Sequence, residues 1–533
     1  MMRRLLPLIC ALAVAGCETT TTNEVSHATG AAPAPARSMA PPVAFRPMMA
    51  DIVYSPPRQI QAPFKDMPDA PPSTWLSTGD NPVSTFSAEV DTASYAVMRR
   101  LLSQTGKVPA QAVRVEEMIN YFPYDYAGPE KRQDGFATHA TIVPSPWKKG
   151  AKLLHLGIKA WAPTTGTRPP ANLTFLVDVS GSMMGADRLP LVQASLRQLV
   201  EALRPDDKVA LVTYASGTAI RLEPTVAGER AKILAAIDGL RAGGGTAGAA
   251  GLNAAYAQAQ AMFEGNAANR VILATDGDFN LGASSPRALE ELITEKRKTG
   301  IYLTVLGVGL GNLNDTTMQS LAQAGNGQAA YLDSLLEARK VLVNQLESSV
   351  IPVADDVKIQ VEFNPAKVAE YRLIGYETRA LRRADFNNDK VDAGEIGAGH
   401  SVTALYEFLP VGVSGKAMDD LRYAPKKKAE TATGQVNDEY AFVKLRHKVP
   451  GQSESRLSTL AVSPSQDLPN LDSASDDVRF AVAIAGFGQI LRGQLDKDMW
   501  GATIALAQGA KGADPYGWRG GAVDLMELAK SMP

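Results

Sequence analysis

The sequence predicts an α/β protein in which a doubly wound, mostly parallel sheet is flanked by strand-rich segments. Short apolar strands alternate with amphipathic helices between residues 172 and 350, a pattern that places helices on both faces of a parallel sheet. A D-x-S-x-S run at residues 178–182 follows the first of these strands. Strand-like alternation returns beyond residue 351. The 533 residues, 45% of them hydrophobic, leave room for more than one core.

The first residues predict a targeting signal. Two arginines precede an apolar stretch at residues 5–14 that is too short to span a membrane. The V-A-G-C run that ends at Cys17 resembles the bacterial lipobox. The resemblance implies a lipoprotein signal peptide over residues 1–16 and lipidation of Cys17, with an ordinary signal peptide and an incidental cysteine as the alternative. Glu18 after the cysteine favours the outer membrane of a bacterial cell envelope, on the periplasmic face or at the surface.

Composition excludes several classes of protein and site. The formal net charge of −2 gives no basic field for nucleic acid. The chain has two cysteines, Cys10 in the signal and Cys17 at the lipidation position, so no thiol remains for a disulfide, a zinc site or a nucleophile. No later stretch has the length and apolarity of a membrane-spanning helix, so we expect an anchored protein that does not span the membrane.

An extended tether and an N-terminal flanking region precede the central domain. Residues 17–78 comprise the lipidated cysteine and a disordered Pro- and Ala-rich tether, whose composition buries too little apolar surface to fold. Residues 79–168 are expected to form the N-terminal flanking domain. The patterns predict strands at 84–90, 136–143 and 153–160, and helices at 92–104 and 111–122.

The central segment, residues 169–350, has the strongest periodicity. The predicted strands are 173–177, 208–214, 270–274 and 301–308. The predicted helices are 189–203, 229–240, 248–263, 286–299, 316–324 and 335–346. Ligands of such sheets bind beyond the carboxyl ends of the strands, which is where the D-x-S-x-S run lies.

The C-terminal flanking domain, residues 351–533, combines strands at 356–448 with helices at 475–533. The predicted strands are 357–363, 371–376, 401–408 and 440–447, and the predicted helices are 478–491, 499–509 and 521–532. The charged stretch 419–435 is expected to be an exposed loop. Because strands of matched character lie on both sides of a complete α/β unit, we hypothesise that residues 136–160 and 357–447 pair into one β-sandwich, with the central domain inserted in it.

Three loops of the central segment carry oxygen donors to one edge of the predicted sheet. The first holds Asp178, Ser180 and Ser182, the Gly-rich second holds Thr246, and the third holds Asp276. Hydroxyl and carboxylate oxygens suit Mg²⁺ or Mn²⁺ far better than Zn²⁺ or copper. A site built mostly from neutral hydroxyls leaves the ion short of negative charge, so a partner protein can supply one more carboxylate.

The segment from residue 172 to 350 resembles a von Willebrand factor type A (VWA) domain, and its three loops resemble the metal-ion-dependent adhesion site of that family. The resemblance implies a Rossmann-like fold with Mg²⁺ held directly by Ser180 and Ser182. It implies that Thr246, Asp178 and Asp276 complete the shell, directly or through water. Mn²⁺ and Ca²⁺ stay open as alternatives. A further carboxylate and amide follow the third loop at Asp278 and Asn280, where they either orient the ligands by hydrogen bonds or form a solvated turn.

The wider chain resembles bacterial lipoproteins that carry a central VWA domain between two flanking domains. Residues 85–95 and 114–122 carry the N-terminal part of this resemblance, and residues 356–407 carry the C-terminal part. The resemblance then covers nearly all of the chain after the tether.

Two other motifs of the chain resemble known binding loops but depart from their patterns. The G-x-G-x-x-G at residues 243–248 follows a helix instead of the first strand of a βαβ unit, which argues against a dinucleotide site. Residues 385–395 start like a calcium loop, but Lys390 replaces the turn glycine and Ile396 the bidentate glutamate, so a polar hairpin loop is favoured.

The sequence therefore predicts a cell-envelope lipoprotein that captures a protein ligand through a divalent cation completed by the ligand's Asp or Glu. No catalytic residue and no small-molecule substrate are expected. One alternative is an envelope scaffold in which an internal carboxylate caps the ion and the metal serves stability. A metal-assisted hydrolase is disfavoured, because hydroxyl ligands are poor at lowering the pKa of bound water.

Overall fold

The computed structural model describes residues 71–88, 91–163, 168–245, 248–277, 286–309, 314–346, 348, 351–389, 391, 393–418 and 438–532. The predicted signal, Cys17, most of the tether and the 419–435 loop lie outside these residues. No helix within the described part of the chain has the length and apolarity needed to cross a membrane.

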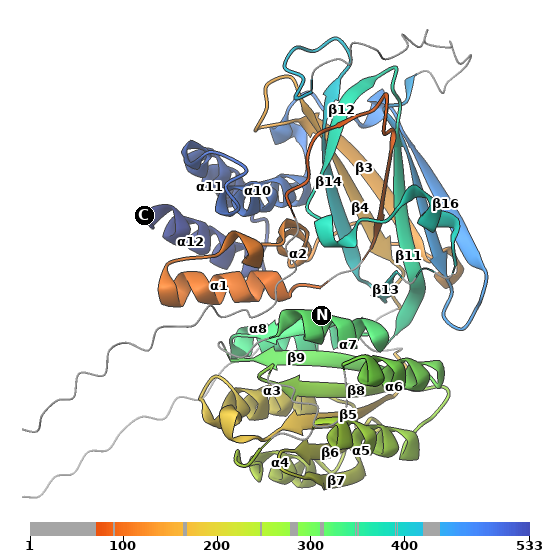
Figure 1. The fold of residues 1–533 in the computed structure, drawn as a ribbon, viewed down its shortest axis with the longest axis vertical. Helices are drawn as coiled ribbons and strands as arrows, with labels where there is room; N and C mark the ends of the chain where they lie inside the picture. The colour runs from red at the N-terminus through yellow and green to blue at the C-terminus, as the bar shows by residue number, and fades with distance from the viewer. Residues whose placement is uncertain are drawn as a thin grey trace, which may run out of the picture. The chain divides into compact units, whose positions relative to one another are not determined.

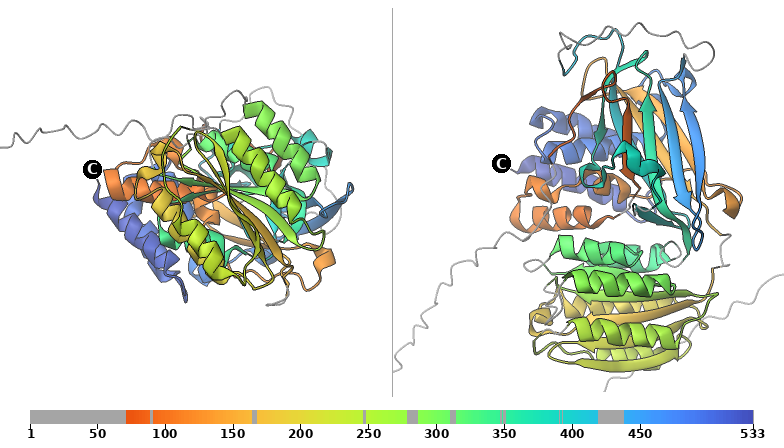
Figure 2. Two further views of the ribbon diagram at one scale, coloured as in Figure 1. Left: turned by 90° about the horizontal axis from the view of Figure 1, so that it is seen from below. Right: turned by 45° about the vertical axis from the view of Figure 1, so that its right-hand side comes forward.

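The central domain is a six-stranded sheet covered by helices on both faces (Figures 1 and 2). Its strand order is β10-β9-β8-β5-β6-β7, and every neighbouring pair is parallel except β6 with β7. The strands are β5 (Ala171–Asp178), β6 (Lys208–Tyr214), β7 (Thr218–Val226), β8 (Ala268–Thr275), β9 (Ile301–Val308) and β10 (Ala329–Leu332).

Two sets of helices close the faces of this sheet. One apolar core contains residues of α3 (Leu189–Ala202), α4 (Arg230–Asp238) and α8 (Leu335–Arg339), which continues as the π-helical segment η4 (Lys340–Asn344). Another contains residues of α5 (Gly248–Ala261), α6 (Pro286–Lys298) and α7 (Asp315–Ala324). The predicted doubly wound fold is confirmed.

Two strands of the central sheet, β7 and β10, were not predicted from the sequence. β7 is an edge strand whose residues are mostly exposed, so its sequence lacks the apolar run of its neighbours. β10 has only four residues, too few for a periodic signal.

The flanking segments pair with each other across the central domain. β3 (Phe136–Pro144) and β4 (Lys152–Ala160) join β1 (Leu76–Ser77), β12 (Val368–Ile374) and β14 (Ser401–Pro410) in one sheet of order β1-β12-β14-β4-β3. In the register of β14 and β4, Ala404 pairs with Leu156.

The second flanking sheet also combines strands from both sides of the central domain. Its order is β13-β11-β15-β16, with β2 paired to β11. Its strands are β2 (Val83–Ser87), β11 (Pro352–Phe363), β13 (Gly394–Gly397), β15 (Ala441–Lys448) and β16 (Ser455–Val462). Phe363 stacks on Tyr371 of the first sheet with ring centroids 4.3 Å apart, as facing sheets of a sandwich do. The hypothesis of one sandwich with an inserted central domain is confirmed.

The remaining helices share a third core. α1 (Ala93–Thr105) and α2 (Val115–Asn120) pack with α10 (Asp476–Leu491), α11 (Trp500–Gly509) and α12 (Trp518–Ser531). The prediction of one helix over residues 111–122 was wrong in length. Ser94 donates to the carbonyl of Ala112 and accepts from the amide of Arg114, and these contacts hold the preceding residues outside the helix.

Candidate metal centre

The predicted metal loops lie where the strand order of the central sheet reverses. The chain runs from β5 to β6 on one side and later returns to β8 on the other side of β5. Asp178 ends β5, and Asp276 follows the last residue of β8. Open α/β sheets bind ligands at such switch points.

Ser180 and Ser182 present a pair of hydroxyls at this edge. Their Oγ atoms lie 3.0 Å apart. Two adjacent ligands of an octahedral Mg²⁺, each about 2.1 Å from the ion, are separated by about 3 Å. Gly181, between them, donates from its amide to the carbonyl of Gly244, and a Cβ on Gly181 would lie only 3.3 Å from that oxygen. The donor set and spacing therefore fit the divalent cation that the fold implies.

Asp178 is buried and held by donors on both carboxylate oxygens. Oδ1 accepts from the Ser180 amide at 2.8 Å, and Oδ2 accepts from the hydroxyls of Tyr214 and Thr275 at 3.1 and 3.3 Å. Burial raises the pKa of the Asp178 carboxyl, and the nearby Asp276 adds to that rise. A carboxylate already fixed by three donors is suited to contact an ion through water.

Asp276 contacts an arginine that the sequence interpretation missed. A guanidinium nitrogen of Arg188 lies 3.3 Å from Asp276 Oδ2 and also donates to the carbonyl of Ser182. Gly309 makes room for this side chain: its φ is +72°, and a Cβ there would lie 2.5 Å from Arg188 Nε. Arg188 comes from the loop before α3, and no spacing in the sequence marks it as a neighbour of Asp276.

The Gly-rich loop reaches the same edge of the sheet. The Gly243 amide donates to the carbonyl of Val179, and the Gly245 amide donates to Ser216 Oγ at 2.7 Å. Thr246 and Asp278 lie outside the described residues, as does Asn280, so their roles stay predictions. The described part of the chain contains no cluster of three or more His, Cys, Asp or Glu side chains arranged for a metal.

The flanking helix α1 reaches the metal loop directly. Arg100 of α1 forms an ion pair with Asp187, the residue before Arg188, and donates to the Tyr331 hydroxyl at 2.7 Å. The flanking unit therefore contacts Asp187, and the next residue in the chain, Arg188, contacts Asp276.

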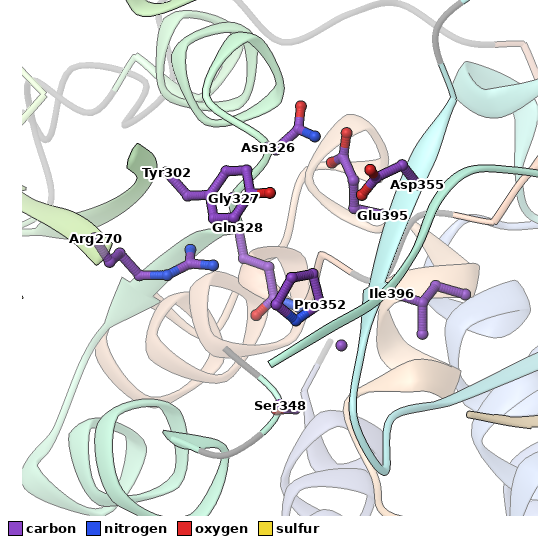
Figure 3. A pocket seen from close by; sticks show the side chains of 11 residues that line it. Arg270, Tyr302, Asn326, Gly327, Gln328, Ser348, Pro352, Asp355, Glu395 and Ile396 are labelled. Carbon is purple, nitrogen blue, oxygen red and sulfur yellow. The ribbon is translucent and has the colours of Figure 1, made fainter. Parts of the chain in front are cut away.

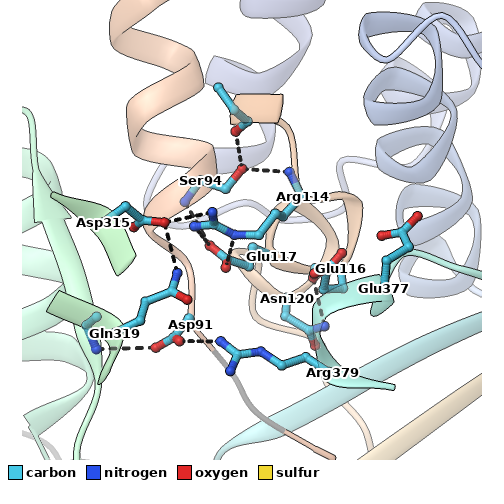
Figure 4. Close-up of polar contacts among 12 residues, drawn as sticks. Asp91, Ser94, Arg114, Glu116, Glu117, Asn120, Asp315, Gln319, Glu377 and Arg379 are labelled. Atoms are coloured by element: carbon cyan, nitrogen blue, oxygen red, sulfur yellow. Dashed lines mark hydrogen bonds and ion pairs between the residues drawn. The ribbon is translucent and has the colours of Figure 1, made fainter. Parts of the chain in front are cut away.

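A second set of polar contacts between the flanking and central parts (Figure 4) is formed by buried side chains. Arg114 pairs with Glu117 of α2 and, at 2.8 Å, with Asp315 of α7. Asp91 accepts from Arg379 at 2.8 Å and from the Ala329 amide at 3.2 Å. These contacts join both flanking segments to the central domain.

A small cavity lies at the amino-terminal ends of β8 and β9 (Figure 3). Arg270 and Tyr302 line one side of it, and Asp355 and Glu395 line the other. Its volume of about 30 Å³ is the share of one water molecule in the liquid. It is too small for an organic ligand.

The calcium-like loop has cationic neighbours. Arg446 lies 3.2 Å from Asn387 Oδ1 and 3.1 Å from both carboxylate oxygens of Asp389. Arg382 pairs with Asp385. Since these candidate donors already face guanidinium groups, the arrangement favours the polar loop over a calcium site.

Comparison with known families decides what kind of protein this is. The model described as "von Willebrand factor type A domain" matches residues 172–345. A model described as "von Willebrand factor" matches residues 64–155, and one described as "Uncharacterized protein YfbK, C-terminal" matches residues 348–532. The "Uncharacterized protein YfbK" of Escherichia coli (strain K12) is 44% identical over 457 residues, 84% of this chain and 78% of that protein. The chain belongs to the YfbK family.

Other relatives of this YfbK-family chain match smaller parts. The Synechocystis protein sll0103 is 28% identical over 186 residues, which are 35% of this chain and 43% of that protein. Inter-alpha-trypsin inhibitor heavy chain H3 of Mesocricetus auratus is 24% identical over 255 residues, 45% of this chain and 28% of that protein. A solved structure titled "von Willebrand factor type A from Catenulispora acidiphila" covers 74% of this chain and 89% of its own, at 15% identity and a TM-score of 0.39.

The match to the VWA domain model carries three general properties. VWA domains typically mediate protein–protein interactions and are generally not enzymes. They commonly bind a divalent metal ion at the adhesion site.

Proposed function

We propose that this chain is a cell-envelope lipoprotein that captures a protein ligand through a divalent cation, with Mg²⁺ as the preferred ion. The observation that carries the proposal is the Ser180–Ser182 hydroxyl pair, 3.0 Å apart and next to the buried Asp178 and Asp276. In this proposal the two serines hold the ion directly. Thr246 and the two aspartates complete its shell, and Asp278 supports them.

The ion supplies a positive centre that a carboxylate of the partner can contact. Two neutral hydroxyls contribute no charge, so an Asp or Glu of the partner is the natural last ligand. Met184 lies on the same loop as Ser182 and is 68% exposed. A partner surface with an apolar residue beside its acidic residue fits this edge.

The proposed location follows from the amino-terminal sequence. Lipid attached to Cys17 would anchor the protein to the outer membrane, and the Pro- and Ala-rich residues after it would hold the folded part away from the bilayer.

A second candidate is a scaffold in which the metal serves stability alone. The contacts of Arg188 with Asp276 and of Arg100 with Asp187 favour it, because they tie the metal loop to the rest of the chain. It differs from the first candidate in requiring no partner carboxylate.

A pull-down from envelope extract separates the two candidates. The bait is the chain from residue 18 onward, in Mg²⁺, in EDTA and as Asp178→Ala, with Asp206→Ala as the control because Asp206 is exposed before β6. Capture by wild type and Asp206→Ala in Mg²⁺ alone supports metal-dependent adhesion. The same proteins in every lane would contradict it. A melting temperature that falls in EDTA, with no captured protein, would favour the scaffold.

A further inference from the structure

A cavity of about 280 Å³ lies where the flanking segments, the last helix of the central domain and the C-terminal helices meet. It is separate from the metal loops. Six of the side chains that line it carry the argument: Tyr121, Lys159, Lys340, His400, Tyr516 and Trp518. Ligand sites in proteins start near this size.

Lys340 brings a buried amine to this cavity, and burial lowers the pKa of that amine to about 7. Its side chain is only 1% exposed, and its Nζ has no hydrogen-bond partner among the described residues. Glu337 Oε1 is 3.9 Å away, beyond hydrogen-bond range, and the other oxygen of Glu337 already accepts from Arg99 and Tyr121 at 2.7 and 2.6 Å. A buried amine without an acceptor is costly, and an anion in the cavity would provide one.

Two more basic groups face the same space. Lys159 of β4 pairs in register with Ser401 of β14, and His400 immediately precedes Ser401. Burial, followed by the charges of Lys159 and Lys340, lowers the pKa of His400 to about 4. Asp125 and Asp477 act on Lys159 electrostatically, but within the described ranges no carboxylate lies within 4 Å of its amine. Lys159 therefore presents a positive charge that no described carboxylate neutralises by contact, and Lys340 adds an amine whose ion-pair partner, Glu337, lies as far as 3.9 Å away.

Flat aromatic faces form another wall. Tyr516 and Trp518 stack with ring centroids 4.6 Å apart and an interplanar angle of 24°. Lys340 Nζ lies 3.0 Å from the centroid of the Tyr121 ring and 5.6 Å from that of Trp518. Lys340 also begins the π-helical segment, an irregularity that is frequent at functional sites.

We propose that this cavity binds a small organic anion, with its carboxylate or phosphate at Lys340 and Lys159 and its flat, apolar body against Trp518. The site does not use the metal loop, so its ligand should bind equally well in Mg²⁺ and in EDTA. If this proposal fails, the proposal of metal-dependent adhesion is not affected.

The test is calorimetric titration of the chain from residue 18 onward, which keeps every described residue. The probes are naphthalene-2-carboxylate and 2-naphthyl phosphate, with neutral naphthalene-2-carboxamide for comparison. We expect at least one anion to bind with one-to-one stoichiometry and the carboxamide to bind at least tenfold more weakly, since a hydrogen bond to a charged group is stronger than one to a neutral group.

Variants assign the binding to this cavity. Lys340→Met should weaken binding of the anion about tenfold or more. Lys159→Met, which changes a half-buried side chain, should weaken binding several-fold. Lys444→Met removes a comparably half-buried strand lysine outside the cavity and should leave binding unchanged. If Lys340→Met does not fold, Lys159→Met decides. No binding of either anion, equal binding of the carboxamide, or wild-type affinity in the folded lysine variants would overturn the proposal.

Discussion

The central domain and the flanking unit are built in opposite ways. All six strands of the central sheet come from residues 171–332, an uninterrupted stretch of chain. Both flanking sheets instead join strands from before and after that stretch, β4 with β14 and β2 with β11. This difference shows that hydrophobic periodicity identifies a strand in the sequence but not the strand with which it pairs, which can lie beyond a whole domain. The four predictions below test how independent the two regions are.

The largest effect is expected where the two regions meet. Arg114→Met removes the guanidinium group that neutralises Glu117 and Asp315 and leaves both carboxylates buried. Breaking a buried ion pair from one side costs about 3–5 kcal/mol. We expect calorimetry to show a lower melting temperature and a central-domain transition separated from that of the flanking unit.

A matched exposed pair provides the control for this variant. Arg287→Met removes the pair with Glu291 on α6, where both side chains are mostly exposed. It should change the free energy of unfolding by about 0.5 kcal/mol or less. A wild-type melting curve in Arg114→Met would show that this contact does not couple the regions.

The next effect lies in the flanking unit and depends on pH. Burial, followed by the charges of Glu377 and Glu117, raises the pKa of Glu116 to about 7. An unfolded glutamate has a pKa near 4.3, so the native state holds an extra proton between these values. The stability that this proton contributes, up to about 3 kcal/mol, is present below about pH 4.3 and is lost as the pH rises through 7.

Glu116→Gln stays neutral and should remove this loss. Urea denaturation at pH 5 and pH 8 should show the variant gaining about 3 kcal/mol relative to wild type at the higher pH. Burial lowers the pKa of His155 and of His447 to about 4, which makes stability rise between pH 4 and 6.5, so the difference between the proteins is the quantity to measure. Glu130→Gln, on an exposed residue, should parallel wild type. If the stability of Glu116→Gln also changes with pH in parallel with wild type, the raised pKa does not belong to Glu116.

The third effect should be confined to the central domain. Mg²⁺ at 100 times its Kd should raise the free energy of unfolding of that domain by about 2.7 kcal/mol. Ser180→Ala combined with Ser182→Ala should abolish the gain, as should EDTA, while Ser458→Ala on β16 should keep it. Thermal melts with and without Mg²⁺ measure this. Undiminished stabilisation in the double variant would place the ion elsewhere.

The smallest effect concerns the guanidinium group of Arg188 beside the metal loop. Arg188→Gln removes a positive charge 3.3 Å from Asp276 and so removes repulsion toward a bound divalent ion. We expect Mg²⁺ to bind about fivefold more tightly, a gain of about 1 kcal/mol, in a calorimetric titration. Arg197→Gln, on the half-exposed part of α3, should have no effect. Weaker binding in Arg188→Gln would mean that the guanidinium group organises Asp276 for the ion.

The central domain was largely predictable because its signals are local. Each buried strand reads as an apolar run, and Asp178, Ser180 and Ser182 lie within five residues of each other. The exposed β7 and the short β10 lack that signal. Arg188 could not be recognised, because its contact with Asp276 depends on how two loops far apart in the sequence approach each other.

The strands of the flanking unit could be predicted from the sequence, but the pairing between them could only be hypothesised. The shortened α2 depends on Ser94, a residue of another helix. The cavity at Lys340 was missed for the same reason. Its residues come from separate segments, and a buried lysine in a helix has the same sequence appearance as an exposed one.

The pairing of β4 with β14 sets an order of events during synthesis. Ala404 emerges from the ribosome about 250 residues after its partner Leu156, a delay on the order of tens of seconds at about 5–20 residues per second. Throughout that interval one edge of β4 has no strand to pair with, and the whole central domain is synthesised before β14 appears. The central domain can therefore be completed before the first flanking sheet. The hairpin of β3 and β4 must keep one edge of β4 unpaired until β14, in the last third of the chain, has been synthesised.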